Sequence, residues 1–400
     1  MNVGIYQATW GGIGGAELYV ASMAEVLSRS HQVEIIHHNP LGMPLDRLQE
    51  VMDVDLSRVA FRCVPKPDRL SGGGTNPFTK YKREKNWAAD LSHPYELFVY
   101  SGLIVPCFCH AKAGCLLTYF PMETMDSYHG RESDVWRRSS ILKQLASRLY
   151  QDFEWRRRMS SYRHKIAISE YTQTWLRRYW GFDSQILYPP LRREFGRVQK
   201  MNRLVSVGRF DPHIKNYETL VRAFLALCDS GVKDWEYVIA GGLNDHGGGE
   251  AFYQESLEHV EKLKSISAGY PVSFLTNLSG SELKRVMESS SVFWHGAGYG
   301  VDAEREPGRM EHFGIVTTEA MAAGCVPVVF RGGGQPEIIR EGEDGYTWKD
   351  PAELVEHTRG LIAAQGLIER MSENARKNVR RFSREAFESR LLAVMSDLLD

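Results

Sequence analysis

Residues 2–27, NVGIYQATWGGIGGAELYVASMAEVL, contain the unit from which the fold of this chain is built. The apolar run at the start predicts a short buried strand. After a run of glycines, Val20, Met23, Ala24 and Leu27 recur at the spacing of one helix face. A strand, a glycine turn and a helix place free backbone N–H groups at a helix N-terminus, where anions are favoured. The stretch therefore predicts a βα unit whose turn either binds an anion or is simply tight.

The glycine turn does not match the dinucleotide fingerprint G-x-G-x-x-G. Counted from Gly12, the second glycine falls correctly at Gly14, but the third position is Glu17. The turn alone therefore does not predict a dinucleotide cofactor.

The composition predicts a globular chain of two domains that acts on neither DNA nor RNA. A chain of 400 residues is too long to fold around a single compact hydrophobic core. Because 49 Lys and Arg balance 50 Asp and Glu, the chain has no overall positive field that would attract nucleic acid. No apolar run reaches the length of a membrane span, and the N-terminus does not read as a signal peptide. The six cysteines match no zinc spacing, so we expect reduced thiols in the cytoplasm.

Strand-like and helix-like segments alternate in both halves of the chain, which predicts parallel sheets covered by helices on both faces. Pro189 and Pro190 cannot continue a helix and form a connector between the halves. We expect an α/β fold with domains at residues 1–190 and 191–382, facing each other across a cleft, and a helix at 383–400 that packs back towards the first domain. Ligands in such folds bind at the carboxyl ends of the strands.

Smaller segments carry further predictions. Residues 69–85, with glycines and a basic run, read as a surface loop. Ser279 and Glu282 form the pattern of a capping box at a helix start. The last helix has an apolar stripe, made of Phe387, Leu391, Leu392, Met395 and Leu399.

Three clusters in the second half contain the candidate functional residues. In SVGRFDPHIKN, Arg209 and Lys215 follow a strand end, where two cations suit a polyphosphate. Taken by itself, this cluster favours the alternative of two solvated surface cations. In MEHFGIVTTEAMAAG, Glu311 and Glu319 are eight residues apart. If a helix begins just after Gly314, its positive end lies between the two carboxylates. Such a site can bind hydroxyls on the carboxylates and a phosphate on backbone amides. A third, weaker signal is the glycine run of VFRGGGQPEII, where the backbone can approach a ligand closely.

These motifs together resemble the donor-binding half of retaining glycosyltransferases of family 4, which have the GT-B fold of two Rossmann-like domains. The matching features are VGRF with Lys215, the E-x7-E pair Glu311 and Glu319 within EHFGIVTTEAMAAGCVPVV, and GGQPEII behind it. GGIGGAE is similar to the first βα loop of that family, and AISEYTQTWLRRYWG with ILYPP to its domain-closing segment.

The resemblance implies a transferase that moves a hexose from a nucleoside diphosphate sugar to a hydroxyl of a glycan or lipid-linked acceptor, with no cofactor and no metal. Arg209 and Lys215 would hold the diphosphate, and Glu319 the nucleotide ribose. Glu311, with the amides of Phe313, Gly314 and Ile315, would hold the sugar hydroxyls. Gly14 and Gly15 would bring N–H groups to the donor from the first domain. The implied catalytic residues are Arg209, Lys215 and Glu311.

This chain departs from the family pattern in two places. Many members carry a histidine in the first domain where this chain has Tyr119, so Tyr119 and Glu123 are the candidates for contact with the sugar or the acceptor. His312 stands where many members have glycine. EHFGI resembles mannose-transferring members that act on lipid-linked oligosaccharides, which favours a donor of the GDP-mannose type.

The segment from Trp136 to Lys165 holds nine Lys and Arg against two acids, with Tyr150 and Trp155 among them. It is either a solvated face or a peripheral contact with an anionic membrane at the cytoplasmic side. DVD at Asp53–Asp55 imitates a metal motif of another glycosyltransferase fold, but it lies away from the clusters and we do not expect it to bind a metal.

Two other functions share this fold class. A sugar-nucleotide epimerase needs an acid–base pair at the sugar ring, and no cluster clearly supplies one. A non-catalytic sugar-nucleotide-binding subunit is disfavoured because Arg209, Lys215, Glu311 and Glu319 are all present. Glycoside hydrolysis on two carboxylates leaves the cationic pair unexplained.

Overall fold

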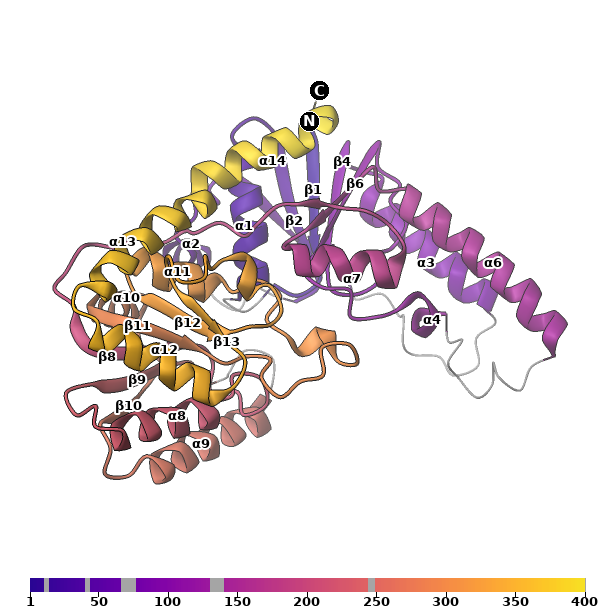
Figure 1. Ribbon diagram of the computed structural model, residues 1–400. Helices are drawn as coiled ribbons and strands as arrows, with labels where there is room; N and C mark the ends of the chain where they lie inside the picture. The colour runs from indigo at the N-terminus through magenta and orange to yellow at the C-terminus, as the bar shows by residue number, and fades with distance from the viewer. Residues whose placement is uncertain (11–13, 40–43, 66–76, 130–139, 244–248, 400) are drawn as a thin grey trace. The chain divides into compact units, whose positions relative to one another are not determined.

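The computed structural model describes residues 1–10, 14–39, 44–65, 77–129, 140–243 and 249–399 (Figure 1). The chain divides into two compact units. The first unit is Met1–Tyr188 with Phe387–Asp400, and the second is Pro189–Ala386.

The first unit is built on a seven-stranded parallel sheet in the order β3-β2-β1-β4-β5-β6-β7. Its central strands are almost entirely buried, as expected for parallel strands covered on both faces. The strands are β1 Asn2–Gln7, β2 Gln32–His37, β3 Val59–Cys63, β4 Leu97–Gly102, β5 Ala113–Thr118, β6 His164–Ala167 and β7 Gln185–Ile186.

Helices connect these strands. They are α1 Gly15–Ser28, α2 Leu45–Met52, α3 Pro77–Ser92, α4 Met125–Tyr128, α6 Ile141–Ser160 and α7 Glu170–Trp180. The sequence dictates the ends of α7: the Ser169 hydroxyl accepts from the N–H of Thr172, and Gly181 ends the helix at φ 73°. Residues of α14 (Arg384–Leu399) return to this unit, where the ring of Phe387 lies 5.3 Å from that of Tyr19.

The second unit has a six-stranded parallel sheet in the order β10-β9-β8-β11-β12-β13. Its strands are β8 Met201–Val207, β9 Glu236–Gly241, β10 Val272–Thr276, β11 Ser290–His295, β12 Val326–Phe330 and β13 Tyr346–Trp348. Its helices are α8 Tyr217–Asp229, α9 Gly249–Ile266, α10 Gly280–Ser289, α11 Ile315–Ala323, α12 Pro351–Ala363 and α13 Leu367–Asn378, with short 3-10 turns at Pro307–Arg309, Gln335–Glu337 and Val379–Phe382. The capping box predicted at Ser279 and Glu282 is confirmed at the start of α10.

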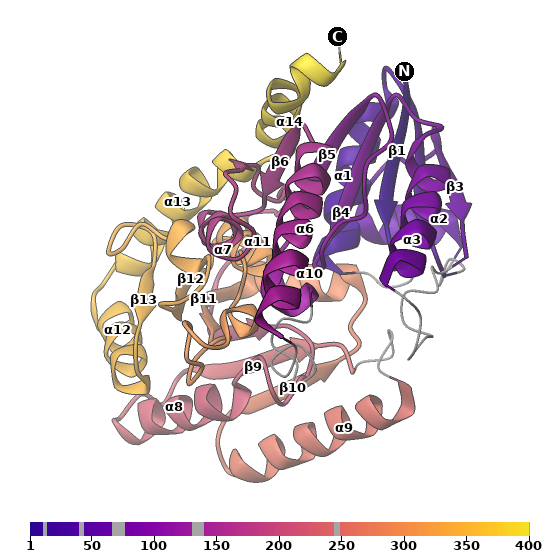
Figure 2. The same cartoon turned by 90° about the vertical axis from the view of Figure 1, so that its right-hand side faces the viewer.

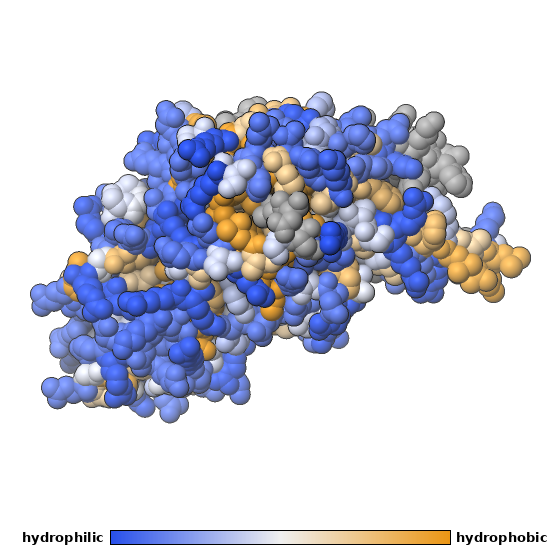
Figure 3. Space-filling view, turned by 90° about the horizontal axis from the view of Figure 1, so that it is seen from above, coloured by the Kyte–Doolittle hydropathy of each residue, from blue (hydrophilic) through white to orange (hydrophobic). Residues whose placement is uncertain are grey.

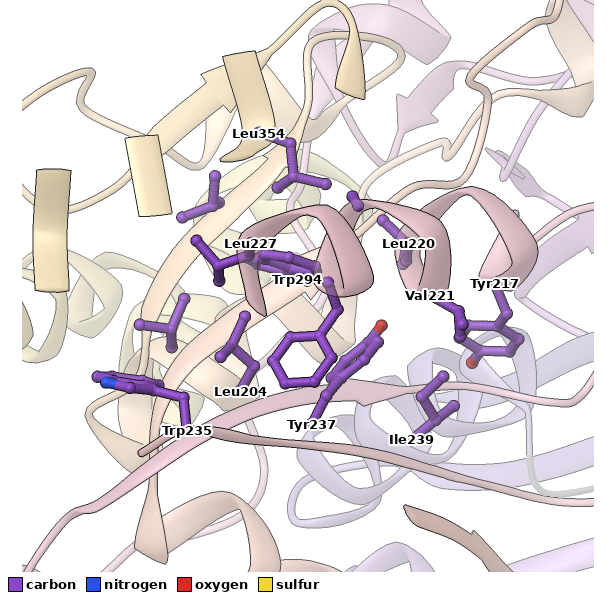
Figure 4. Close-up of a cluster of buried hydrophobic side chains, with 14 of the residues drawn as sticks. Leu204, Tyr217, Leu220, Val221, Leu227, Trp235, Tyr237, Ile239, Trp294 and Leu354 are labelled. Carbon is purple, nitrogen blue, oxygen red and sulfur yellow. The ribbon is translucent and has the colours of Figure 1, made fainter. Parts of the chain in front are cut away.

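The core of the second unit lies between its sheet and the helices that cover it. Leu220 and Leu227 of α8 pack with Leu204 of β8 and with Trp294 of β11 (Figure 4). Figure 2 shows α8 and α9 beside the β9 and β10 side of this sheet. Burial of these apolar side chains holds the ends of β8 and β11 in place.

Three details differ from the sequence analysis. Residues 77–85 belong to α3 and are not a loop, while 69–76 lie outside the described residues. The strands β3, β7 and β13 were not predicted. In α14, Phe387, Leu391 and Met395 are buried, but Leu392 is 41% exposed, and Val394 and Leu398 are buried instead. Among the described residues, no helix combines the length and the apolar character that crossing a bilayer requires.

Candidate functional site

The candidate residues of the second unit gather where its strand order reverses. β8 and β11 are neighbours in the sheet, yet the chain leaves them towards opposite edges. Such a switch point opens a crevice at the carboxyl ends of the strands, where α/β folds bind ligands. Arg209 follows β8, and His295 is the last residue of β11, so both lie at this edge.

A tight turn presents Lys215. Asp211 accepts hydrogen bonds from the N–H groups of His213 (2.8 Å) and Ile214 (3.2 Å). Asn216 adopts φ 54°, and its side-chain amide donates to Gly296 O at 2.9 Å. These bonds fix the loop between β8 and α8. Lys215 Nζ then donates to Glu311 Oε2 at 3.1 Å.

His295 faces the same carboxylate. Its Nε2 lies 3.3 Å from Glu311 Oε2, and its side chain is only 6% exposed. Burial lowers the pKa of His295, although Glu311 opposes the shift. The ring is therefore neutral near pH 7, and its Nε2–H donates to the carboxylate.

Glu311 is held in the ionised form. Burial by itself would raise the pKa of Glu311, but the Lys215 ammonium and the His295 ring outweigh it and hold this pKa well below its ordinary value. The carboxylate is thus an anion over the whole physiological pH range, able to accept hydrogen bonds from hydroxyl groups.

Helix α11 begins directly after this loop, as the sequence predicted. Gly314 is its N-cap residue at φ 111°, Ile315 is its first residue, and Phe313 is buried against the ring of Phe382. A Cβ on Gly314 would lie 2.3 Å from Gln335 Nε2, so both the conformation and the space require glycine. The first N–H groups of a helix have no partner within it, and Glu311 lies four residues before the first residue of α11.

The glycine run after β12 packs against the loop that carries Glu311. Gly334 N donates to Glu311 O at 2.8 Å, and a Cβ on Gly333 would lie 2.0 Å from that oxygen. A Cβ on Gly334 would lie 2.5 Å from His312 O. In the structure this backbone packs closely against the loop that carries Glu311, and the approach of a ligand to it stays a prediction.

Glu319 lies one turn into α11 and is 8% exposed. Burial raises the pKa of Glu319, while Arg193 opposes the shift. The Arg193 Nε atom lies 3.8 Å from Glu319 Oε1, too far for a strong hydrogen bond. The carboxylate of Glu319 therefore has acceptor capacity left for hydroxyl donors.

Arg209 is exposed after the end of β8. Within the part of the chain that the structure describes, its guanidinium has neither a hydrogen bond nor an ion pair. Its five N–H donors are thus available to an anion at the switch point.

Gly14, Gly15 and Tyr119 come together in the first unit. Gly14 is the N-cap of α1 in an extended conformation (φ −112°), and Gly15 is the first helical residue. The Tyr119 hydroxyl donates to Ala16 O at 2.9 Å and lies 2.7 Å from Ser101 Oγ. Burial raises the pKa of Tyr119 well above its ordinary value. Its hydroxyl supports the first turn of α1, so a direct contact with a sugar stays a prediction.

Glu123 precedes the short helix α4 and is partly buried, and its backbone oxygen accepts from Trp180 Nε1 at 2.7 Å. In DVD, Asp53 ends α2 at φ 53°, and Asp55 accepts from the N–H of Ser57 at 2.9 Å. In the described ranges, no three or more His, Cys, Asp and Glu side chains gather in an arrangement that could hold a metal ion.

Sequence reasoning missed three residues of this site: Arg193, His295 and Gln335. His295 could have been found, because it ends a strand at the same sheet edge as Arg209. Gln335 accepts from Thr317 Oγ1 at 2.9 Å beneath Gly314. Gln335 lies within GGQPEII, a motif that the sequence pointed to without giving this residue a role, and no sequence pattern connects Arg193 with Glu319.

Family models match nearly the whole chain. The model described as Glycosyltransferase Family 4 matches residues 13–191, and the one described as Glycosyl transferases group 1 matches residues 189–378.

Curated relatives are more distant. The GDP-Man:Man(3)GlcNAc(2)-PP-Dol alpha-1,2-mannosyltransferase of Dictyostelium discoideum is 26% identical over 241 residues, which cover 55% of this chain and 44% of the relative. Alpha-1,3/1,6-mannosyltransferase ALG2 of Homo sapiens is 28% identical, covering 54% and 53%. The D-inositol 3-phosphate glycosyltransferase of Actinosynnema mirum is 29% identical, covering 52% and 47%. The chain spans about half the length of the curated relatives it matches.

Solved structures match over the full length. Sucrose-phosphate synthase from Thermosynechococcus elongatus superposes with a TM-score of 0.66 at 14% identity, covering 100% of this chain and 99% of that one. Anabaena HepE in complex with UDP-glucose gives 0.63 at 15% identity, covering 99% and 100%. At such identities the likeness shows the fold. The two family matches and this fold show that the chain belongs to glycosyltransferase family 4, a retaining family, and has the GT-B fold.

Proposed function

We propose that this glycosyltransferase moves a hexose from a nucleoside diphosphate sugar to a hydroxyl of a glycan or lipid-linked acceptor, with GDP-mannose as the first donor to test. The observation that carries the proposal is the cluster of Lys215, His295 and Glu311 beside the N-terminus of α11. It combines an anionic acceptor for sugar hydroxyls with positive charge for a diphosphate.

The roles follow from the geometry within the second unit. Arg209 and the remaining N–H donors of Lys215 hold the diphosphate and offset the negative charge that grows on it as the glycosidic bond breaks. Glu311 accepts from hydroxyls of the sugar, oriented by His295. Glu319 accepts from the ribose hydroxyls. At the positive end of α11, further hydrogen-bond donors to the sugar come from the backbone amides of Phe313, Gly314 and Ile315.

Several named relatives support mannose as the sugar. The relatives from Dictyostelium discoideum and Mus musculus are both described as GDP-Man-dependent alpha-1,2-mannosyltransferases. We extend the proposal to a metal-independent reaction, since the cations and helix N-terminus named above supply positive charge at the diphosphate.

The proposal is tested by the thermal stability of the protein with UDP, GDP, ADP or CMP, each with EDTA and with magnesium. At a ligand concentration one hundred times its dissociation constant, binding adds about 2.7 kcal/mol to the free energy of unfolding. We expect GDP to stabilise the protein equally in both buffers. Stabilisation that needs magnesium would contradict the metal-independent reaction, and the absence of any shift would contradict the donor site.

A further inference from the structure

Helix α6 exposes an unusual amount of apolar side chain. The exposed fractions run from 46% for Tyr150 to 82% for Ile141. Globular proteins expose such residues singly, and a contiguous group on one element marks an interaction surface. The exposed apolar side chains of α6 are Ile141, Leu142, Leu145, Leu149, Tyr150 and Phe153. We call these six the α6 apolar face.

The periodicity of the helix places most of this face on one side. Leu142, Leu145, Leu149 and Phe153 follow one another at intervals of three, four and four residues, which puts them in one row along the helix. Figure 3 shows hydrophobic side chains gathered at the projecting end of α6.

The other side of α6 attaches it to the first unit. Trp155 and Met159 are buried in the core, and Arg158 Nη1 donates to Glu84 Oε1 of α3 at 2.6 Å and to Pro106 O at 2.8 Å. Figure 1 shows α3 and α6 extending together from the sheet of the first unit. Because the C-terminal half of α6 is anchored, its N-terminal half is presented as a preformed helix. The apolar face does not depend on a folding transition to form.

Cations border the apolar face. Lys143, Arg148, Arg156 and Arg157 are exposed along α6. The helix contains two acids, Asp152 and Glu154, and Glu154 is buried and accepts from Arg158 Nε at 2.8 Å. The outward surface of α6 therefore combines a row of apolar side chains with an excess of positive charge.

We propose that the α6 apolar face lies on the surface of an anionic lipid bilayer, with Leu142, Leu145, Leu149 and Phe153 at the boundary between headgroups and acyl chains. Lys143, Arg148, Arg156 and Arg157 contact the lipid phosphates. An amphipathic helix of this composition binds in the plane of the membrane, and anionic headgroups attract the cations beside it. A second copy of the chain fits less well, because packing two such faces together would bring their cations together.

The structure also changes which residues carry the contact. Of the interleaved aromatic residues that the sequence suggested, Tyr150 is 46% exposed and belongs to the α6 apolar face, Trp155 is 5% exposed and packs in the core, and Trp136 lies outside the described residues. Leucines and Phe153 supply the apolar contact instead. The proposal does not depend on the donor site, since binding to lipid is measured without nucleotide.

The test is co-sedimentation of the full chain with vesicles of phosphatidylcholine alone, or of phosphatidylcholine and phosphatidylglycerol in equal parts, at low and high salt. We expect binding to the anionic vesicles that weakens with salt. Replacing Leu145, Leu149 and Phe153 together by Gln should lower the partition coefficient by at least about tenfold. Replacing Arg148, Arg156 and Arg157 by Gln should lower it by about a hundredfold, or about fivefold for each cation.

Matched controls change the same residue types elsewhere. Val198 and Leu392 are 47% and 41% exposed, and replacing both by Gln should leave vesicle binding unchanged. For the arginine variant, the control replaces Arg222 and Lys264 by Gln, and it should also leave vesicle binding unchanged. These two cations are exposed on α8 and α9. All substitutions are at exposed positions, so the thermal midpoints should stay close to that of the unchanged protein.

Two results would overturn the proposal. One is equal binding of the leucine variant and the unchanged protein to anionic vesicles. The other is self-association of the unchanged protein that the leucine variant loses, without vesicle binding, which would assign the face to a second copy. In either case an intact thermal response to nucleotide would show that the membrane contact alone is overturned and that the proposed transfer reaction is untouched.

Discussion

The Nε2 atom of His295 lies 3.3 Å from Oε2 of Glu311, the carboxylate oxygen that also accepts from the Lys215 ammonium at 3.1 Å. Glu311 and Glu319 thus share one motif but have opposite electrostatic surroundings. The pKa of Glu311 is lowered by its two partners, and the pKa of Glu319 is raised by burial. The two substitutions to Gln should therefore change stability in opposite directions.

Replacing Glu311 by Gln should destabilise the fold at neutral pH by about 1–3 kcal/mol, because the Lys215 ammonium loses its charged partner. A carboxyl whose folded-state pKa is lowered stabilises the fold above its unfolded-state pKa and loses that contribution as the pH falls. The difference in the free energy of unfolding between the variant and the unchanged protein should therefore become smaller below pH 4.5, which is the ordinary pKa of this carboxyl. Urea unfolding at several pH values measures it. Glu261→Gln, in an exposed pair, is the control, and a deficit that does not change with pH would contradict the ion-pair explanation.

Replacing Glu319 by Gln should leave the free energy of unfolding at pH 7 equal or higher. A carboxyl with a raised folded-state pKa favours folding in its protonated form, and this contribution is lost as the pH rises through that pKa. The neutral amide of the variant avoids that loss. The free energy of unfolding of the variant, relative to the unchanged protein, should therefore increase above pH 4.5, which is the ordinary pKa of this carboxyl. The thermal shift produced by nucleotide should fall in the same variant, since the ribose loses its acceptor. A variant that is less stable at pH 7 would show that the contact with Arg193 outweighs burial.

Most of the sheet architecture was predictable because its central strands are apolar runs. β1, β4, β8, β9 and β11 are buried on both faces, and such strands need no alternation to be recognised. β3 lies at the sheet edge with only Val59 fully buried, and β7 and β13 have two and three residues. β3 lacks the continuous apolar run of the central strands, and β7 and β13 are too short to form a recognisable pattern, so all three were missed.

The site was predictable where its residues are close in sequence. Gly314 separates Glu311 from α11, and this local geometry follows from one short motif. His295 meets Glu311 only because β11 ends beside β8, and Arg193 meets Glu319 from the segment of the second unit that precedes β8. Such contacts depend on tertiary packing, which local patterns do not encode.

Replacing Lys215 by Ala should reduce turnover by about 10²–10³-fold, the usual effect of removing one preorganised donor from a developing negative charge. The same change removes a partner of Glu311, so circular dichroism should first establish that the variant is folded. Lys264→Ala, on the exposed surface of α9, is the matched control and should retain full turnover. Turnover within about twofold of the unchanged protein would remove Lys215 from the donor site.

The last prediction concerns a residue that we do not place against the donor. Gly333 has φ 63°, and a Cβ there would lie 2.0 Å from Glu311 O. Gly333→Ala should therefore displace the backbone of Glu311 and lower turnover by tenfold or more, since a shift of about 1 Å at a reacting group can reduce rates by about 10².

Gly342→Ala is the matched control for this change. Gly342 has φ 74°, so alanine there meets the same backbone strain, but no atom lies within 4 Å of its Cβ position. Both variants should lose a similar part of their stability through the left-handed conformation. Only Gly333→Ala should also lose turnover, while Gly342→Ala should keep the turnover of the unchanged protein. Equal turnover in the two variants would show that the glycine run does not position Glu311, and that the tight contact between the two loops can relax without moving the carboxylate.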